Sequence, residues 1–143
     1  MLKGIDPLLG PELLMILRTM GHGDEIAIVD GNYPAAADAR RLVRMDGHGA
    51  EALLAAILSV MPLDGDQQAA FRPGIHGNLA HEVPIMRKFQ AIVQNYEPQV
   101  ILQPLLGDTF YARVKGAFAI VASGERALYG NLVLRKGVVT PEM

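Results

Sequence analysis

The sequence predicts an α/β protein: a single three-layer domain in which helices cover both faces of a mainly parallel sheet. Short apolar runs, typical of strands covered on both faces, alternate with segments whose apolar residues recur at helical spacing. Hydrophobic residues make up 50% of the 143 residues and charged residues 20%, which excludes a disordered chain and allows a sizeable core. No repeat, low-complexity segment or linker divides the chain. We therefore expect one domain over residues 1–143.

The first elements alternate between helix and strand. Pro11 occupies a favoured first-turn position and opens a helix that ends at Gly21. Residues 26–29 form an apolar run that predicts a buried strand. The alanines after Pro34 fit a single helical turn, and a second strand is expected over 42–45.

The middle of the chain contains two helices and one ambiguous segment. Leucine and isoleucine at helical spacing predict a helix over 51–61, which Pro62 terminates. Residues 64–66, Asp-Gly-Asp, indicate a turn. Residues 71–75 are ambiguous because a proline and a glycine interrupt them, whereas a helix is expected over 84–95.

The last part contains three expected strands and one helix. A strand is expected over 100–102, and Asp108 is a suitable N-cap for the helix that follows. The last strands are expected over 118–122 and 132–134. This order of elements completes the α/β prediction.

Composition excludes several classes of protein. A net charge of −2 gives no electrostatic case for nucleic-acid binding, and a chain without cysteine has neither disulfides nor thiolate metal sites. No apolar run is long enough to span a bilayer, and the N-terminus lacks a signal-peptide pattern, so a cytoplasmic protein without membrane contact is expected. The apolar residues are mostly aliphatic, and their surplus on a short chain suggests buried subunit interfaces.

One histidine stands out as a candidate for proton transfer. His22 lies between Gly21 and Gly23 at the start of the first strand, and Asp30 follows that strand. Flanking glycines allow a tight bend and keep other side chains away from the imidazole, which exchanges protons near neutral pH. The alternative interpretation is a C-cap glycine followed by a loop that contains a histidine.

Other chemistries find less support. The glycines around His22 precede a strand, the reverse of the order that a dinucleotide site requires. The four histidines, including His48, His76 and His81, have no recognised metal-ligand spacing, so we expect no metal site. No serine lies in a nucleophile motif. Asp30 and Asp46 each follow a strand, so both are candidates for one crevice at the carboxyl edge of the sheet.

What remains is acid/base chemistry by a small polar set. Its members are His22, Asp30, Tyr111, Arg113 and Tyr129. Like His22, the other members also have structural explanations. The two tyrosines can be interfacial packing, the arginine can lie on a solvated helix face, and the aspartate can cap a turn.

Two groups of segments, one in each half of the chain, carry a family resemblance. The first comprises Met1-Leu2-Lys3-Gly4-Ile5, Leu13-Leu14, Met20-Gly21-His22-Gly23-Asp24-Glu25-Ile26 with Asp30, and Pro34-Ala35. The second comprises Phe110-Tyr111-Ala112-Arg113, residues 115–121, residues 124–127 and residues 129–138. In this order they resemble the fucose mutarotases, which form one small-sugar family with the ribose pyranases.

The resemblance implies an enzyme that interconverts the anomers of a free monosaccharide, L-fucose or a related sugar, without a cofactor. His22 matches the family's proton donor, Asp30 its sugar-contacting aspartate, and Tyr129-Gly130-Asn131 a sugar-binding segment. We expect His22 and Tyr129 to be catalytic. The substrate-binding residues are then expected to be Asp30, Tyr111, Arg113, Gly130 and Asn131.

Two departures from the family pattern limit what the resemblance explains. Where fucose enzymes have a basic residue before the Phe-Tyr pair, this chain reads Leu106-Gly107-Asp108. Residues 67–81 also match poorly, which leaves His76 and His81 without a role. A non-catalytic monosaccharide-binding protein accessory to transport remains the alternative, and a purely structural ring protein is a third reading.

The resemblance also implies self-association. Family members form rings, typically decamers, with sites near subunit contacts. We expect the last strand and its flanks to pack against a neighbouring subunit, so that the site is complete only in the ring.

Overall fold

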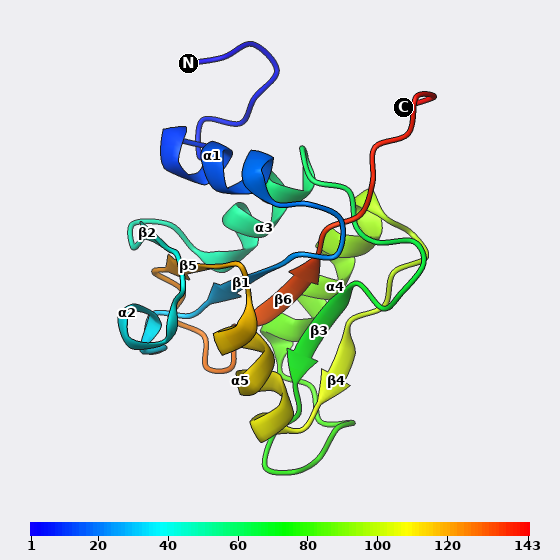
Figure 1. The fold of residues 1–143 in the computed structure, drawn as a ribbon. Coiled ribbons are helices and arrows are strands. Elements are labelled where there is room, and N and C mark those ends of the chain that lie inside the picture. The colour runs from blue at the N-terminus through cyan, green and yellow to red at the C-terminus, as the bar shows by residue number, and fades with distance from the viewer.

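The computed structural model describes all 143 residues, and a six-stranded sheet forms its centre (Figure 1). The strands lie in the order β2-β5-β1-β6-β3-β4. Only β6 runs antiparallel to its neighbours, so the prediction of a mainly parallel sheet is confirmed. The strands are β1 (Glu25–Val29), β2 (Leu42–Met45), β3 (Ala70–Pro73), β4 (Gln103–Leu105), β5 (Ala119–Ser123) and β6 (Leu132–Arg135).

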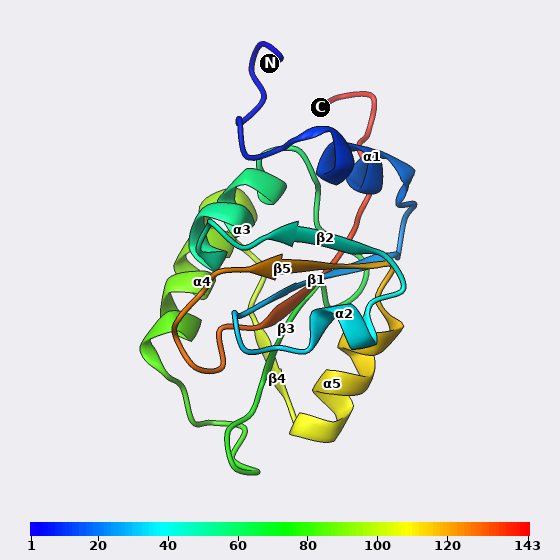
Figure 2. The same cartoon turned by 90° about the vertical axis from the view of Figure 1, so that its left-hand side faces the viewer.

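Helices cover both faces of this sheet, as Figure 2 shows. One face packs against α1 (Pro11–Thr19), α3 (Ala50–Leu58) and α4 (Pro84–Tyr96), and the other against α2 (Ala35–Asp38) and α5 (Gly107–Gly116). The division follows the alternation of side chains along the strands: Ile26 and Ile28 join the first core, whereas Ala27 and Val29 join the second. The predicted three layers are confirmed. None of these helices has the length and apolar character needed to cross a bilayer.

Three predicted boundaries were wrong. The helix expected over 51–61 ends at Leu58, three residues before the limit expected from Pro62. The strand expected over 100–102 lies at 103–105 instead. The Gln90 side chain occupies backbone hydrogen-bonding groups of residues 100–102, which are then not available for pairing in the sheet. Its amide accepts from the Leu102 N–H at 2.7 Å and donates to the Val100 carbonyl at 3.0 Å. Helix α5 starts one residue before Asp108, so Leu106 is the N-cap residue and no side chain caps the helix.

The position of β6 contradicts the expectation that the last strand packs against a neighbouring subunit. Residues Leu132, Val133 and Leu134 are fully buried, and β6 is hydrogen-bonded to β1 on one side and to β3 on the other. A strand in this position belongs to the core of its own subunit. Only its flanks are available for contacts with another copy.

Deleting the chain from Leu132 onward is therefore expected to abolish folding rather than assembly alone. The deletion separates the β2-β5-β1 half of the sheet from the β3-β4 half and removes three fully buried side chains. Loss of each such side chain alone typically costs about 2–5 kcal/mol, which is comparable to the total stability of a domain. Circular dichroism of the truncated protein tests this, and a cooperatively folded product would contradict it.

Candidate functional site

A cavity of about 440 Å³ opens beyond the carboxyl end of β1. Asp30 directly follows β1 and Asn131 directly precedes β6, so the antiparallel pairing of these strands places the two side chains together. Ligands in open α/β sheets bind at this edge, and the volume suits a small polar molecule. The cavity is lined by Asp30, Asn32, Tyr33, Pro34, Asp38, Tyr111, Lys115, Leu128, Tyr129 and Asn131.

Asp30 and Asn131 form a buried polar pair in the cavity wall. The Asp30 N–H donates to Asn131 Oδ1 at 2.7 Å, and Asn131 Nδ2 donates to Asp30 Oδ2 at 3.3 Å. Asp30 Oδ1 also accepts from the Asn32 N–H at 3.0 Å. Each carboxylate oxygen has two lone pairs and only one bond here, so both retain a free site for a ligand donor.

Aromatic side chains also line the cavity. Tyr33 and Tyr111 stack with ring centroids 5.9 Å apart, and the Tyr33 hydroxyl donates to Asp38 Oδ2 at 2.8 Å. Burial and this bond raise the pKa of Tyr33, and burial together with Asp30 and Tyr129 raises the pKa of Tyr111. Both phenols therefore stay protonated at neutral pH. Both rings offer an apolar face to the same ligand, whereas the one hydroxyl proton of Tyr33 is already donated to Asp38.

A strained turn holds Tyr129 in the cavity wall. Tyr129 adopts a left-handed backbone conformation with φ 61°, which is uncommon for a residue with a side chain. A Cβ at the next residue, Gly130, would lie 2.9 Å from Glu125 Cγ and 3.1 Å from the Ala127 carbonyl oxygen, so the turn requires glycine there. The Tyr129 ring also meets the His76 ring edge-on at 6.3 Å. Gly130 thus acts by permitting this turn, and it does not line the cavity itself.

His22 lies at the opposite end of the sheet from this cavity. It precedes the first residue of β1 by three positions, whereas Asp30 follows the last. A five-residue strand spans about 17 Å. Arg135 at the end of β6 pairs with Glu25 at the start of β1, and Leu132 at the start of β6 pairs with Ile28 near the end of β1. Strand β6 therefore connects the same two ends of the sheet. One chain alone does not bring His22 to the cavity.

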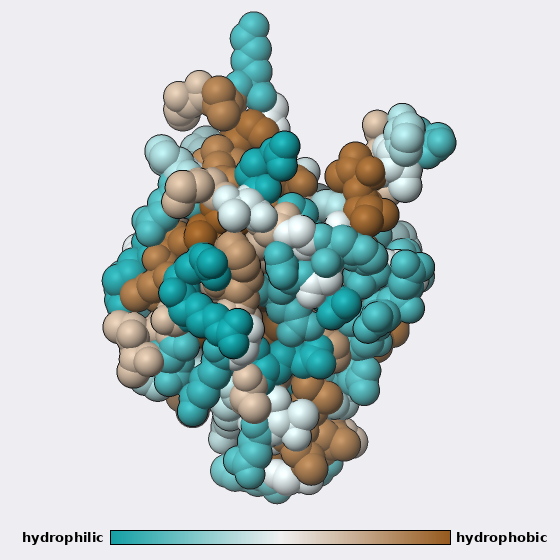
Figure 3. All heavy atoms as spheres, viewed as in Figure 1, coloured by the Kyte–Doolittle hydropathy of each residue, from teal (hydrophilic) through white to brown (hydrophobic).

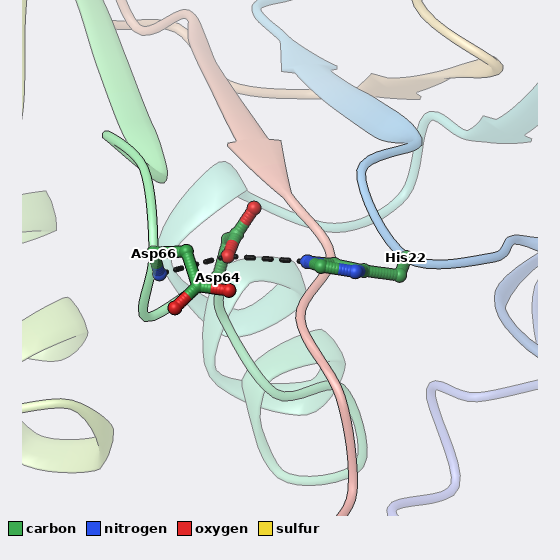
Figure 4. Close-up of side chains that lie close together, drawn as sticks. All are labelled: His22, Asp64 and Asp66. Atoms are coloured by element: carbon green, nitrogen blue, oxygen red, sulfur yellow. Dashed lines mark hydrogen bonds and ion pairs between the residues drawn. The ribbon is translucent and has the colours of Figure 1, made fainter.

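The His22 side chain instead contacts a buried carboxylate (Figure 4). Its Nε2 lies 3.2 Å from Asp64 Oδ1. The same oxygen accepts from the Asp66 N–H at 3.0 Å, and Asp64 Oδ2 accepts from Arg135 Nε at 2.8 Å. These hydrogen bonds hold the pKa of Asp64 well below its usual range, with the Asp66 N–H making the largest contribution. Asp64 is therefore a fixed anion at neutral pH.

The residues around His22 also form the one group with metal-ligand proximity. Ligand atoms of His22, Asp64 and Asp66 all lie within 4.8 Å of one another. The Arg135 guanidinium, however, already neutralises Asp64 and lies where a cation would be repelled. This arrangement fits a hydrogen-bonded histidine better than a metal centre.

Two other predicted polar residues lie outside the cavity. Arg113 pairs with Glu25 at 2.9 Å and stacks over the Phe71 ring at 3.9 Å. Burial raises the pKa of Glu25, although Arg113 and Arg135 oppose this shift. Asp46 pairs with Arg44 at the surface and does not line the cavity. The expectation that it shares a crevice with Asp30 is therefore wrong.

The structure adds five polar residues that the sequence interpretation missed, among them Asn32 in the cavity wall. Tyr33, Asp38 and Lys115 line the cavity, and Asp64 contacts His22. Tyr33 lies in an Asn-Tyr-Pro segment that indicates only a loop, and Asp64 in an Asp-Gly-Asp turn. Neither pattern distinguishes a functional side chain from ordinary turn chemistry. A signal existed only for Lys115, which lies within a segment that resembles the family.

The chain is similar to known proteins over nearly its whole length. Residues 3–139 match the model of the RbsD / FucU transport protein family. The fucose mutarotase of Danio rerio is 41% identical over 147 residues, covering 99% of this chain and 96% of that protein. The L-fucose mutarotase of Glaesserella parasuis is 38% identical over 140 residues, covering 96% of each. The crystal structure of the fucose mutarotase from Streptococcus pneumoniae in complex with L-fucose has a TM-score of 0.88 at 38% identity. It covers 97% of this chain and 100% of that one.

Proposed function

Since the chain belongs to the RbsD / FucU transport protein family, we propose that it is a mutarotase, an isomerase that interconverts the anomers of a free monosaccharide, L-fucose or a related sugar. The observation that carries this proposal is the cavity that the Asp30–Asn131 pair lines together with the stacked tyrosines. Hydroxyl groups of a sugar suit the polar pair, and its apolar ring face suits an aromatic wall.

The chemistry requires two proton transfers and no change in oxidation state. Ring opening removes a proton from the anomeric hydroxyl and delivers one to the ring oxygen as the bond from that oxygen to the anomeric carbon breaks. Ring closure on the other face of the carbonyl reverses both transfers and gives the other anomer. His22 protonates the ring oxygen, and Tyr129 or a water held by Asp30 accepts the anomeric proton. A positioned acid or base typically contributes about 10²–10⁴-fold to the rate.

Asp30 and Asn131 orient the sugar by hydrogen bonds to its hydroxyls. Tyr111 adds a protonated phenol to the cavity wall. Arg113 acts at a distance from the sugar, because its guanidinium is held by Glu25 outside the cavity. Its contribution is to the packing of α5, the helix that carries Tyr111.

Two copies of the chain are needed to complete this site. His22 and the cavity lie at opposite ends of β1, so the His22 end of one copy has to meet the cavity of another. Figure 3 shows apolar side chains gathered near α1 and on the C-terminal segment, at the same end as His22. Met15, Val60, Val138 and Val139 are exposed there, and Leu106 and Leu128 are exposed near the cavity. Head-to-tail contacts of this kind generate a ring where the rotation between copies closes, and the family resemblance implies ten copies.

A panel of free sugars tests the proposed activity. Nuclear magnetic resonance exchange spectroscopy measures the rate at which each anomer converts into the other, with and without the purified protein. We expect acceleration for L-fucose that exceeds the acceleration for D-ribose. Gly107 removes one charged contact, which is typically worth about 1.5–3 kcal/mol, so fucose turnover is expected to be slower than in an enzyme with a basic residue there.

The same panel separates the alternatives. A sugar-binding protein accessory to transport shifts the resonances of a bound sugar but leaves the exchange rate unchanged, which would refute the enzyme. A structural ring protein produces neither effect. Clear preference for ribose would overturn the fucose assignment while leaving the reaction type in place.

A further inference from the structure

His22 has a buried partner that the proposed chemistry does not use. The His22 side chain is 47% exposed and that of Asp64 is 2% exposed, so the contact joins a reactive group at the surface to the interior. Asp64 lies in the turn after α3, more than forty positions from His22 in the sequence. In an inference that rests on the proposed function, we propose that Asp64 is the positioning residue of the catalytic histidine. It fixes the orientation of the His22 ring, and it selects Nδ1 as the nitrogen that exchanges protons with the sugar.

The hydrogen-bond inventory of the two side chains supports this selection. An ionised carboxylate only accepts hydrogen bonds, so the nitrogen that faces Asp64 has to carry a proton. This nitrogen is Nε2, at 3.2 Å from Asp64 Oδ1. A neutral ring has one N–H, so Nδ1 is then left as the free base. Protonation of the ring at Nδ1 creates the acid that the ring oxygen of the sugar requires.

Asp64 is itself held rigidly, which a positioning group requires. The Asp66 N–H fixes one oxygen and Arg135 Nε the other, so the carboxylate cannot rotate toward a different partner without losing a bond. Arg135 lies 3.9 Å from Glu25, which also binds Arg113. Charges therefore alternate from Asp64 through Arg135 and Glu25 to Arg113, and none of them is left unpaired.

The turn that carries His22 is fixed against the same group. Gly23 has φ 89°, and a Cβ there would lie 2.9 Å from Arg135 Nη2. The Gly21 N–H donates to Asp24 Oδ2 at 2.8 Å, and the Gly23 N–H donates to the carbonyl of Lys136. Gly23 thus allows the backbone of His22 to lie close to the strand end that holds Arg135. The imidazole is positioned at its backbone and at its ring.

A spectroscopic test reports on the contact without relying on activity. In ¹H–¹⁵N spectra of the full-length protein, we expect a slowly exchanging, low-field Nε2–H resonance of His22, assigned by its loss in His22→Ala. The resonance should disappear in Asp64→Asn and persist in Asp66→Asn. The Asp66 variant is a matched control, because it removes an equal charge within 4.8 Å without removing a bond to His22.

Kinetics on the same variants completes the test. We expect kcat of anomer exchange to fall at least about tenfold in Asp64→Asn with little change in KM, and Asp66→Asn to stay close to the wild type. An equal loss in both variants, or an Nε2–H resonance that is absent from the folded wild type or survives in Asp64→Asn, would overturn the proposal. If Asp64→Asn does not fold, the wild-type spectrum alone still shows whether Nε2 of His22 carries the hydrogen-bonded proton. A wild type with the resonance but without anomer exchange would refute the proposed function and leave the hydrogen bond established.

Discussion

Replacing His22 with alanine is expected to lower the rate of anomer exchange at least about a hundredfold, the usual contribution of a positioned acid. The side chain is nearly half exposed and lies in a loop, so its removal takes nothing from either core cluster. Circular dichroism should therefore match the wild type, and the midpoint of thermal unfolding should fall only by what the lost hydrogen bond to Asp64 contributes. Exchange spectroscopy with L-fucose measures the rate.

His48 provides a matched control for this variant. It also lies between two glycines and is exposed, and its hydrogen bonds are made by its backbone. Its N–H donates to the Met45 carbonyl at 3.0 Å, and its carbonyl accepts from the Gly124 N–H at 2.7 Å. Substitution of its side chain by alanine leaves both bonds in place. His48→Ala should retain wild-type exchange. A His22→Ala protein with wild-type rates would dispose of the proposed role of His22.

Mixing two defective chains is expected to restore activity. His22→Ala lacks the acid, and Asp30→Asn lacks a charged hydrogen bond to the sugar, a loss of about 10–100-fold in rate. When the two variants are co-expressed and assemble at random, about a quarter of the sites combine an intact His22 from one copy with an intact cavity from another. The co-assembled protein should then have about a quarter of the wild-type activity, well above either parent.

Two measurements control this experiment. Light scattering establishes that each variant and the mixture form the same assembly. Separately purified rings that are combined without subunit exchange should show only the average of the two residual activities. If the co-expressed protein also shows only that average, His22 and Asp30 act within a single subunit, and the shared site is wrong.

Local patterns predicted most of the fold. Prolines at helix starts, such as Pro11 and Pro84, mark boundaries by a backbone constraint that holds in any tertiary context, and both starts were confirmed. The strand at 103–105 could not be predicted, because its position depends on Gln90, a side chain from a helix that supplies the hydrogen bonds of residues 100–102. The sequence also did not reveal that β6 lies at the centre of the sheet. A buried strand has the same apolar sequence whether its neighbours belong to its own chain or to another.

The site was predicted in its residues but not in its geometry. Asp30, Tyr111, Tyr129 and Asn131 were predicted and do line one cavity. The separation of His22 from Asp30 was implicit in the sequence, because the predicted strand over 26–29 lies between them, but the family motif groups the two residues by role and not by position. Asp64 escaped notice because its partners, His22 and Arg135, are each far away in the chain.

The antiparallel pairing of β1 with β6 has a consequence for how the protein can be regulated. Both strands are almost completely buried, and together they separate the histidine from the cavity by a fixed length that no loop movement can shorten. Under the proposed shared site, a single subunit contributes one part to each of two active sites and completes neither alone. We then expect the activity per molecule to depend on the concentration of the chain, to rise where subunits associate and to be lost on dilution. Synthesis and degradation of the chain would then change the fraction of sites that are complete as well as the amount of protein.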